Sequence, residues 1–258
     1  MIWMKRQLLG LTAAVGLLAM TTPLATAAAA CDDLPGDAAL TDALRDAIAP
    51  TGGPTNGGLE THMWATLVDR SGTVCAVTRS GDSPGDQWPG SRAISAQKAN
   101  TANSFSLPTL ALSTANLWAA TQPGGSLYGL QHSNPVNTEA AYKGSFKTYG
   151  TAEDPLVGSK IGGVNVFGGG LALYTDEGDL IGALGVSGNT SCADHNIAWR
   201  VRSALGLANV PAGVSPDNND AVIYDVNEDD DSASGFGHPQ CGNSEHEVAS
   251  QIGAGVNP

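Results

Sequence analysis

The stretch of residues 162–188, GGVNVFGGGLALYTDEGDLIGALGVSG, constrains the fold more than any other part of the sequence. Two apolar segments flank the turn signal Asp176-Glu177-Gly178, a pattern that predicts a β-hairpin. Both predicted strands are apolar on both faces, whereas a strand with one side in water alternates apolar and polar residues. The sheet that holds this hairpin must therefore be covered by other elements.

Apolar periodicity and turn signals predict four further elements before this hairpin. They are a helix over 37–49 with Leu40, Leu44 and Ile48 on its apolar face, a hairpin over 63–79 that turns at 69–72, and two helices over 90–106 and 108–120. Ser91 is the expected N-cap of the second helix, whose apolar face is expected at Ile94, Thr101 and Phe105, and Pro108 opens the third. The order of helices and hairpins predicts an α+β fold, an antiparallel sheet flanked by helices.

Residues 122–160 are rich in Gly, Pro, Ser and Asn and are expected to form a long loop. A loop of this length inside a compact domain is often functional, because secondary structure connections are usually much shorter. The sequence therefore directs attention to this loop as a place for binding residues.

The first thirty residues have the pattern of a secretory signal peptide. Lys5 and Arg6 precede an apolar run over 8–20, and small residues lead up to Cys31. The run is too short for a comfortable membrane span, so cleavage near Ala30 and a secreted or periplasmic mature protein are predicted. The alternative is a bacterial lipoprotein with a lipid on Cys31, which is the weaker interpretation because Ala28 stands where Leu is usual.

Four cysteines remain after that cleavage, and an even number in an exported chain favours two disulfides. Spacing alone leaves all three connectivities open. We expect Cys31–Cys75 and Cys192–Cys241, because each pair would tie a terminal segment to the body of the domain.

Charge excludes one class of partner. The whole chain has a formal net charge of −13, and loss of the signal peptide removes two more positive charges. Nucleic-acid binding requires a basic surface, so no nucleic-acid partner is expected. Stable membrane insertion is not expected either, because no second apolar span follows. We expect the mature chain to divide into a domain over 31–212 and an acidic extension over 213–258.

The segment 188–200, GNTSCADHNIAWR, opens the last predicted helix and gathers chemically active side chains. Ser191 stands three residues before Asp194, a start that resembles a capping box with Asp in place of Glu. No GxSxG elbow occurs in the sequence, so a hydrolase of that type is not indicated. The triple glycine 168–170 precedes a strand and not a helix, which argues against a phosphate loop and favours close approach to a strand or ligand.

Two of these stretches, AISAQKANTANSFS (93–106) and residues 161–200, resemble the GlcG/HbpS-like family, also found as the carboxy-terminal domain of PduO-type proteins. The resemblance covers roughly residues 60–207. It is most specific in the hairpin that ends at Gly188, followed by Asp194, and in the lysine-bearing helix around Lys98. The chain differs from the common pattern at Asn100, where many members have Arg, and at His195, where an acidic residue is usual. The longer 122–160 segment, the cysteines and the acidic tail also set it apart.

This resemblance implies a profilin- or PAS-like architecture that often assembles as a homo-oligomer. It also implies a small-molecule ligand, since several family members bind haem, and one exported member acts with a sensor protein. The resemblance therefore predicts non-covalent binding of haem or a related cofactor for sensing, storage or handling.

His195 is the first candidate iron ligand. Imidazole is a common haem ligand in its neutral form, and the positive end of a helix disfavours the imidazolium. The alternative is a histidine that only hydrogen-bonds the preceding loop. His132, in the long loop, is the second candidate, because loops carry more than their share of binding residues; its alternative is a solvated side chain.

Lys98 and Asp194 complete the predicted cofactor-binding set. Lysines on helices usually extend to solvent, but the family match favours contact between Lys98 and a carboxylate or haem propionate. Asp194 is expected to cap its helix or to pair with a nearby base. An alternative function is an enzyme that acts on a small oxygenated or ring compound, with Lys98, Asp194 and His195 as acid, base and anion-holding groups. A structural or partner-binding module is a third interpretation.

Overall fold

The computed structural model describes residues 31–51 and 55–257. The predicted signal peptide and the alternative lipoprotein leader at 1–30 lie outside the described residues. Within the described part of the chain, no helix is both long enough and apolar enough to cross a membrane.

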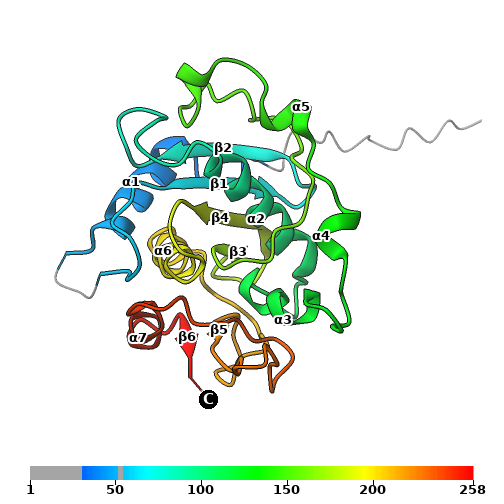
Figure 1. Ribbon diagram of the computed structural model, residues 1–258. Coiled ribbons are helices and arrows are strands. Elements are labelled where there is room, and N and C mark those ends of the chain that lie inside the picture. The colour runs from blue at the N-terminus through cyan, green and yellow to red at the C-terminus, as the bar shows by residue number, and fades with distance from the viewer. Residues whose placement is uncertain (1–30, 52–54, 258) are drawn as a thin grey trace, which may run out of the picture.

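A four-stranded antiparallel sheet forms the centre of the molecule (Figure 1). Its order is β2-β1-β4-β3, and the strands are β1 (Trp64–Asp69), β2 (Val74–Arg79), β3 (Gly170–Tyr174) and β4 (Leu180–Ser187). Strands β1 and β4 pair along their length in the middle of the sheet, so the two predicted hairpins lie side by side. The predicted α+β class and both hairpin turns are confirmed, and the apolar strands are buried on both faces.

Helices α1 (Asp37–Ile48) and α6 (Ser191–Ala204) cover one face of the sheet. The core on this side combines Leu40 and Leu44 of α1 with Leu67, Leu184 and Ile197. The apolar face predicted for the first helix is thus the face that packs against the sheet. Burial of such leucines contributes about 1.5–3 kcal/mol for each side chain.

Helix α2 (Ser91–Phe105) covers the other face and lies unusually close to the strands. A Cβ added at Gly185 of β4 would overlap the carbonyl oxygen of Ser95 and lie 2.5 Å from the nitrogen of Ala99. The buried residues of α2 are therefore mostly small, and the larger exceptions are Arg92, Lys98 and Asn103. The expected apolar face was wrong in part: Thr101 is buried, but Ile94 and Phe105 are only partly buried.

Two other expectations about helices were wrong. Gly90, and not Ser91, is the N-cap of α2. Residues 108–114 are not helical, because the side chains of Ser106 and Asn116 bind the main chain of Leu112 and Ser113 and so compete with helical hydrogen bonds. Only the end of that segment is helical, as η1 (Ala115–Leu117) and α3 (Trp118–Thr121).

The predicted long loop is ordered around short helices. They are α4 (Leu130–Ser133), α5 (Thr138–Ala141) and η2 (Phe146–Thr148). A buried ion pair joins this loop to α2: Arg92 Nε lies 2.8 Å from Asp154 Oδ2, and the same carboxylate accepts the N–H groups of Gly150 and Leu156. The loop is therefore fixed against the α2 side of the domain.

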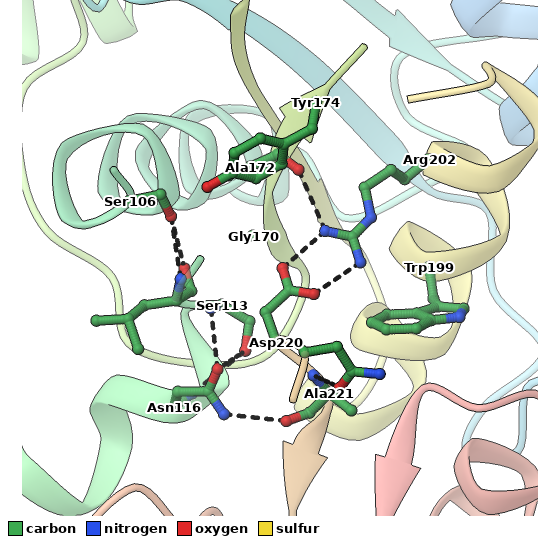
Figure 2. A network of polar contacts seen from close by, with 12 residues as sticks. Ser106, Ser113, Asn116, Gly170, Ala172, Tyr174, Trp199, Arg202, Asp220 and Ala221 are labelled. Atoms are coloured by element: carbon green, nitrogen blue, oxygen red, sulfur yellow. Dashed lines mark hydrogen bonds and ion pairs between the residues drawn. The ribbon is translucent and has the colours of Figure 1, made fainter. Parts of the chain in front are cut away.

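The C-terminal segment, residues 213–257, packs beside α6 (Figure 1). Its elements are β5 (Val222–Ile223), α7 (Glu245–Gln251) and β6 (Gly255–Val256), with β5 and β6 parallel. Figure 2 shows its main polar anchor, in which both Asp220 oxygens meet Arg202 at 2.7 and 2.8 Å. Arg202 also donates to the Ala172 carbonyl, and its guanidinium lies 4.6 Å from the ring centroid of Trp199.

Both predicted disulfides are confirmed. Cys31–Cys75 ties the segment before α1 to β2, with a Cα–Cα distance of 5.5 Å. Cys192–Cys241 ties the C-terminal segment to the start of α6, with a Cα–Cα distance of 6.0 Å. No free cysteine remains among the residues that the structure describes.

Candidate functional site

Two predicted site residues that are distant in sequence meet in the core. Lys98 Nζ on α2 lies 2.6 Å from Asp194 Oδ2 on α6, and their side chains are only 2% and 3% exposed. Lys98 also donates to the Val186 carbonyl of β4, which lies between the two helices. The lysine is therefore not solvated, and the carboxylate that it contacts belongs to the chain itself.

The triple glycine at residues 168–170 lies against this ion pair. A Cβ at Gly169, whose φ is +112°, would lie 3.3 Å from Lys98 Nζ and 3.0 Å from the Cβ of Asp194. Only glycine tolerates this backbone conformation and this closeness at once. The expectation of a close backbone approach is confirmed, and the approached groups are the buried pair.

Asp194 is held at the start of α6 but is not part of a capping box. The cap is Thr190, whose hydroxyl accepts the N–H of Ala193 at 3.2 Å. Asp194 Oδ1 accepts the N–H of Asn189 at 2.8 Å, while Oδ2 faces Lys98. Complete burial raises the pKa of Asp194 to about 6, against the opposing effects of Lys98 and the main-chain hydrogen bonds.

His195 is neutral, as expected, but its side chain has no opening to solvent. Its side chain is fully buried, and burial lowers its pKa to about 3, so the ring is neutral at physiological pH. Neither ring nitrogen makes a hydrogen bond of normal geometry, although the main chain of Ala254 is close to the ring. The ring stacks on Trp199 at 6.0 Å between centroids and faces Asp220 of the C-terminal segment. A ligand would reach His195 only if that segment moved.

His132 lies in the opposite environment. It is exposed on α4, in the long loop. No contact joins it to Lys98, Asp194 or His195 among the described residues, so the predicted set does not converge on one site. Lys98 and Asp194 are brought together, whereas the two histidines stay separate.

A pocket of about 600 Å³ contains a third histidine that the sequence did not favour. His62 is exposed at its wall, and Ser80 Oγ lies 3.1 Å from His62 Nδ1, which orients the ring. The pocket lies between the end of α1, the start of α6 and the loop before β1. Its lining is apolar at Ile48, Ala49, Leu59 and Ile197 and polar at Thr55, Asn56, Glu60, Thr61, Asn189, Asn243 and Ser244. Nothing local marks His62 in the sequence, because the pocket forms only when the two termini of the domain pack together.

Comparison with known proteins gives one family. Residues 58–202 match the family model described as haem degrading protein HbpS-like, which is more than half of the chain. No curated protein matches.

Several solved structures are similar to part of the chain. The PduOC:heme complex is 26% identical, with a TM-score of 0.45, and the match covers 66% of this chain and 93% of that one. Protein ORFY of Klebsiella pneumoniae is 25% identical, with a TM-score of 0.44 and coverages of 66% and 90%. A double mutant of Streptomyces reticuli HbpS is 18% identical, with a TM-score of 0.39 and coverages of 76% and 99%.

Proposed function

The chain belongs to the HbpS-like family, and from this premise we propose that it binds haem or a related tetrapyrrole non-covalently. The family match carries the proposal. We further propose that it acts after export, as a sensing, storage or handling protein. The two disulfides support export, because such bonds persist in oxidising compartments.

The described residues offer imidazoles that fit haem iron in different ways. His195 is neutral and free of good hydrogen bonds, which suits a metal ligand, but it is covered. His132 is open to solvent without a pocket of its own. His62 combines an exposed ring, a fixed orientation and a pocket within the usual size of small-molecule sites. Haem would supply an iron centre, and we propose His62 as its ligand, with His132 and His195 as the alternatives.

The pocket walls also predict how the rest of the group is held. Apolar side chains suit the porphyrin face, whereas the charged side chain in the lining is Glu60, with no lysine or arginine. Haem propionates would therefore gain little from these walls. Lys98 is not free to bind them either, since Asp194 already occupies it. Binding should depend on apolar contact and iron coordination, and only weakly on salt.

A haemin titration of the mature, oxidised protein followed by absorbance tests this proposal. A saturable Soret shift near one equivalent is expected, lost in His62→Ala and kept in the control His246→Ala. Loss only in His132→Ala would place the ligand on the long loop. Loss only in His195→Ala would mean that the C-terminal segment opens. The absence of any saturable shift would overturn the proposal.

We also propose how the protein assembles and where its domain ends. We expect a homo-oligomer and a possible sensor-protein partner, both testable by light scattering and by pull-down with a candidate sensor domain. The domain limits 31–212 and the extension 213–258 are testable by truncation after residue 212. The alternative enzyme would need access to Lys98 and Asp194, which the described conformation buries.

A further inference from the structure

A second cluster of reactive side chains lies at the start of α6. Ser191 Oγ is 2.7 Å from His238 Nε2, and His238 Nδ1 is 2.7 Å from the Pro239 carbonyl oxygen. A carbonyl only accepts, so Nδ1 carries the hydrogen and Nε2 is the acceptor. The Ser191 hydroxyl therefore donates to His238, the arrangement that a serine nucleophile and its general base require.

A third group points at the same oxygen. The N–H of Gly168 donates to Ser191 Oγ at 2.7 Å. A Cβ at Gly168 would lie 2.5 Å from the Ser191 carbonyl oxygen and 3.0 Å from the Cβ of His195, so only glycine fits where this N–H reaches the serine. This N–H holds the Ser191 oxygen in a fixed position beside His238.

Burial and exposure divide the roles within the cluster. His238 is 2% exposed, and burial lowers its pKa to about 4, which keeps its ring neutral and able to accept a proton. Ser191 is only partly buried, and Phe167, the neighbour of Gly168, is 47% exposed. The disulfide Cys192–Cys241 holds the segment that carries His238 against the helix start. The base is fixed and shielded, whereas the nucleophile is partly exposed beside the exposed ring of Phe167.

From these contacts we propose that Ser191 and His238 form a second, hydrolytic site for small esters with an apolar acyl group. Ser191 Oγ attacks the ester carbonyl carbon while its proton passes to His238 Nε2. The bond to the alcohol oxygen breaks, and that oxygen leaves with the proton. Water then gives a proton to His238 and attacks the acyl-serine, which releases the carboxylic acid and restores the serine hydroxyl. The sum is one ester and one water converted to one acid and one alcohol.

The sequence alone does not reveal this site. The two side chains are 47 residues apart, and the group that orients the histidine is a main-chain carbonyl, which no residue type marks. No GxSxG elbow is needed when a loop tied by a disulfide supplies the base. The site involves neither His62 nor the proposed haem pocket, so the two proposals can fail separately.

Treatment of the oxidised protein with a fluorophosphonate, followed by peptide mass mapping, tests the proposal. A phosphonyl adduct on Ser191 is expected, together with hydrolysis of p-nitrophenyl acetate above the buffer rate. Ser191→Ala should abolish both, and His238→Gln should slow both on the order of 100-fold. Ser203→Ala, at the exposed far end of α6, is the matched control and should change neither. Thermal melting shows that each variant is folded.

A pH profile of the wild type keeps the test decisive if His238→Gln does not fold. The labelling rate should rise as the pH passes through about 4, where His238 loses its proton. A folded wild type that carries no adduct on Ser191 would overturn the proposal. An adduct that forms equally fast in folded His238→Gln would overturn it as well, because the serine would then react without its base.

Discussion

Two buried ion pairs hold the two ends of α6, and they differ in kind. Near its N-terminus, Asp194 meets the lysine of α2 within the part of the chain that matches the family. Near its C-terminus, Arg202 meets Asp220 of the C-terminal segment, beyond that match. The lysine offers a point charge to one carboxylate oxygen, whereas the arginine binds both oxygens of its partner in parallel. The inner pair belongs to the family domain, and the outer pair attaches an addition to it.

Because of this difference, the two pairs should respond differently when one partner is removed. A lysine can release its proton when it is left unpaired in the core, but an arginine stays charged. Loss of one partner should therefore destabilise the fold more at the Arg202–Asp220 pair than at the Lys98–Asp194 pair. This holds although Asp220 lies outside the residues that match the family.

Removal of Asp220 should have the largest effect. Asp220→Asn leaves the Arg202 charge buried without a counter-charge, and we expect a loss of about 3–5 kcal/mol in the free energy of unfolding. Urea unfolding of the oxidised protein measures this loss. Asp217→Asn, an exposed carboxylate on the same segment, is the control and should stay within about 0.5 kcal/mol. Equal stability of the two variants would contradict the role of Asp220 as an anchor of the C-terminal segment, which Figure 2 shows.

Removal of Asp194 should cost less. Asp194→Asn leaves a buried lysine that can become neutral, so we expect about 1–3 kcal/mol. The double variant Lys98→Met with Asp194→Asn should cost less than the sum of the single variants, because each residue is buried chiefly for the other. Simple additivity in the same urea experiment would show that the two side chains do not depend on one another.

Acid titration tests the N-terminal end of α6, where Asp194, His195 and the His238 that contacts Ser191 all lie. His195 and His238 have folded-state pKa values of about 3 and about 4, below the ordinary 6.5, so their contribution is complete above pH 6.5 and is lost as the pH falls. Asp194, raised from 3.8 to about 6, acts in the opposite direction: its contribution is present below pH 3.8 and is lost as the pH rises through about 6.

Between pH 6 and 4.5 the unfolded chain binds protons on both histidines, whereas the folded chain binds one on Asp194. The free energy of unfolding should therefore fall on acidification in this range. Each proton changes the slope of unfolding free energy by about 1.4 kcal/mol per pH unit. His195→Gln should flatten the fall by about that amount, and Asp194→Asn should steepen it by the same amount. Urea midpoints at several pH values test the signs. A slope that neither variant alters would mean that these groups titrate alike in the folded and unfolded chains.

The sequence predicted what local signals encode. Turn residues at 69–72 and at Asp176-Glu177-Gly178 gave both hairpins, and the spacing of Leu40, Leu44 and Ile48 gave the packed face of α1. The rule that large apolar residues mark the buried face did not work for α2. That helix lies so close to the sheet that its buried residues are mostly small, with Arg92, Lys98 and Asn103 as the larger exceptions.

The site was predicted only in part, for the same kind of reason. The resemblance selected Lys98 and Asp194, and the fold brings them together. The covering of His195 by the C-terminal segment, and the meeting of Ser191 with His238, depend on a segment outside the family pattern. Contacts between residues so far apart in the chain produce no periodic pattern in the sequence around either residue.

The smallest expected effect concerns how α6 and α2 begin. The sequence placed a cap at Ser191 and at Ser91, whereas the structure caps α6 with Thr190 and gives α2 no side-chain cap. Thr190 also donates to Glu245 Oε1 of α7 at 2.8 Å. Thr190→Ala should therefore lower the free energy of unfolding by about 1 kcal/mol, and Ser91→Ala should change it by less than about 0.5 kcal/mol. Thermal unfolding of the two variants measures the difference, and a larger loss in Ser91→Ala would mean that the serine caps α2 after all.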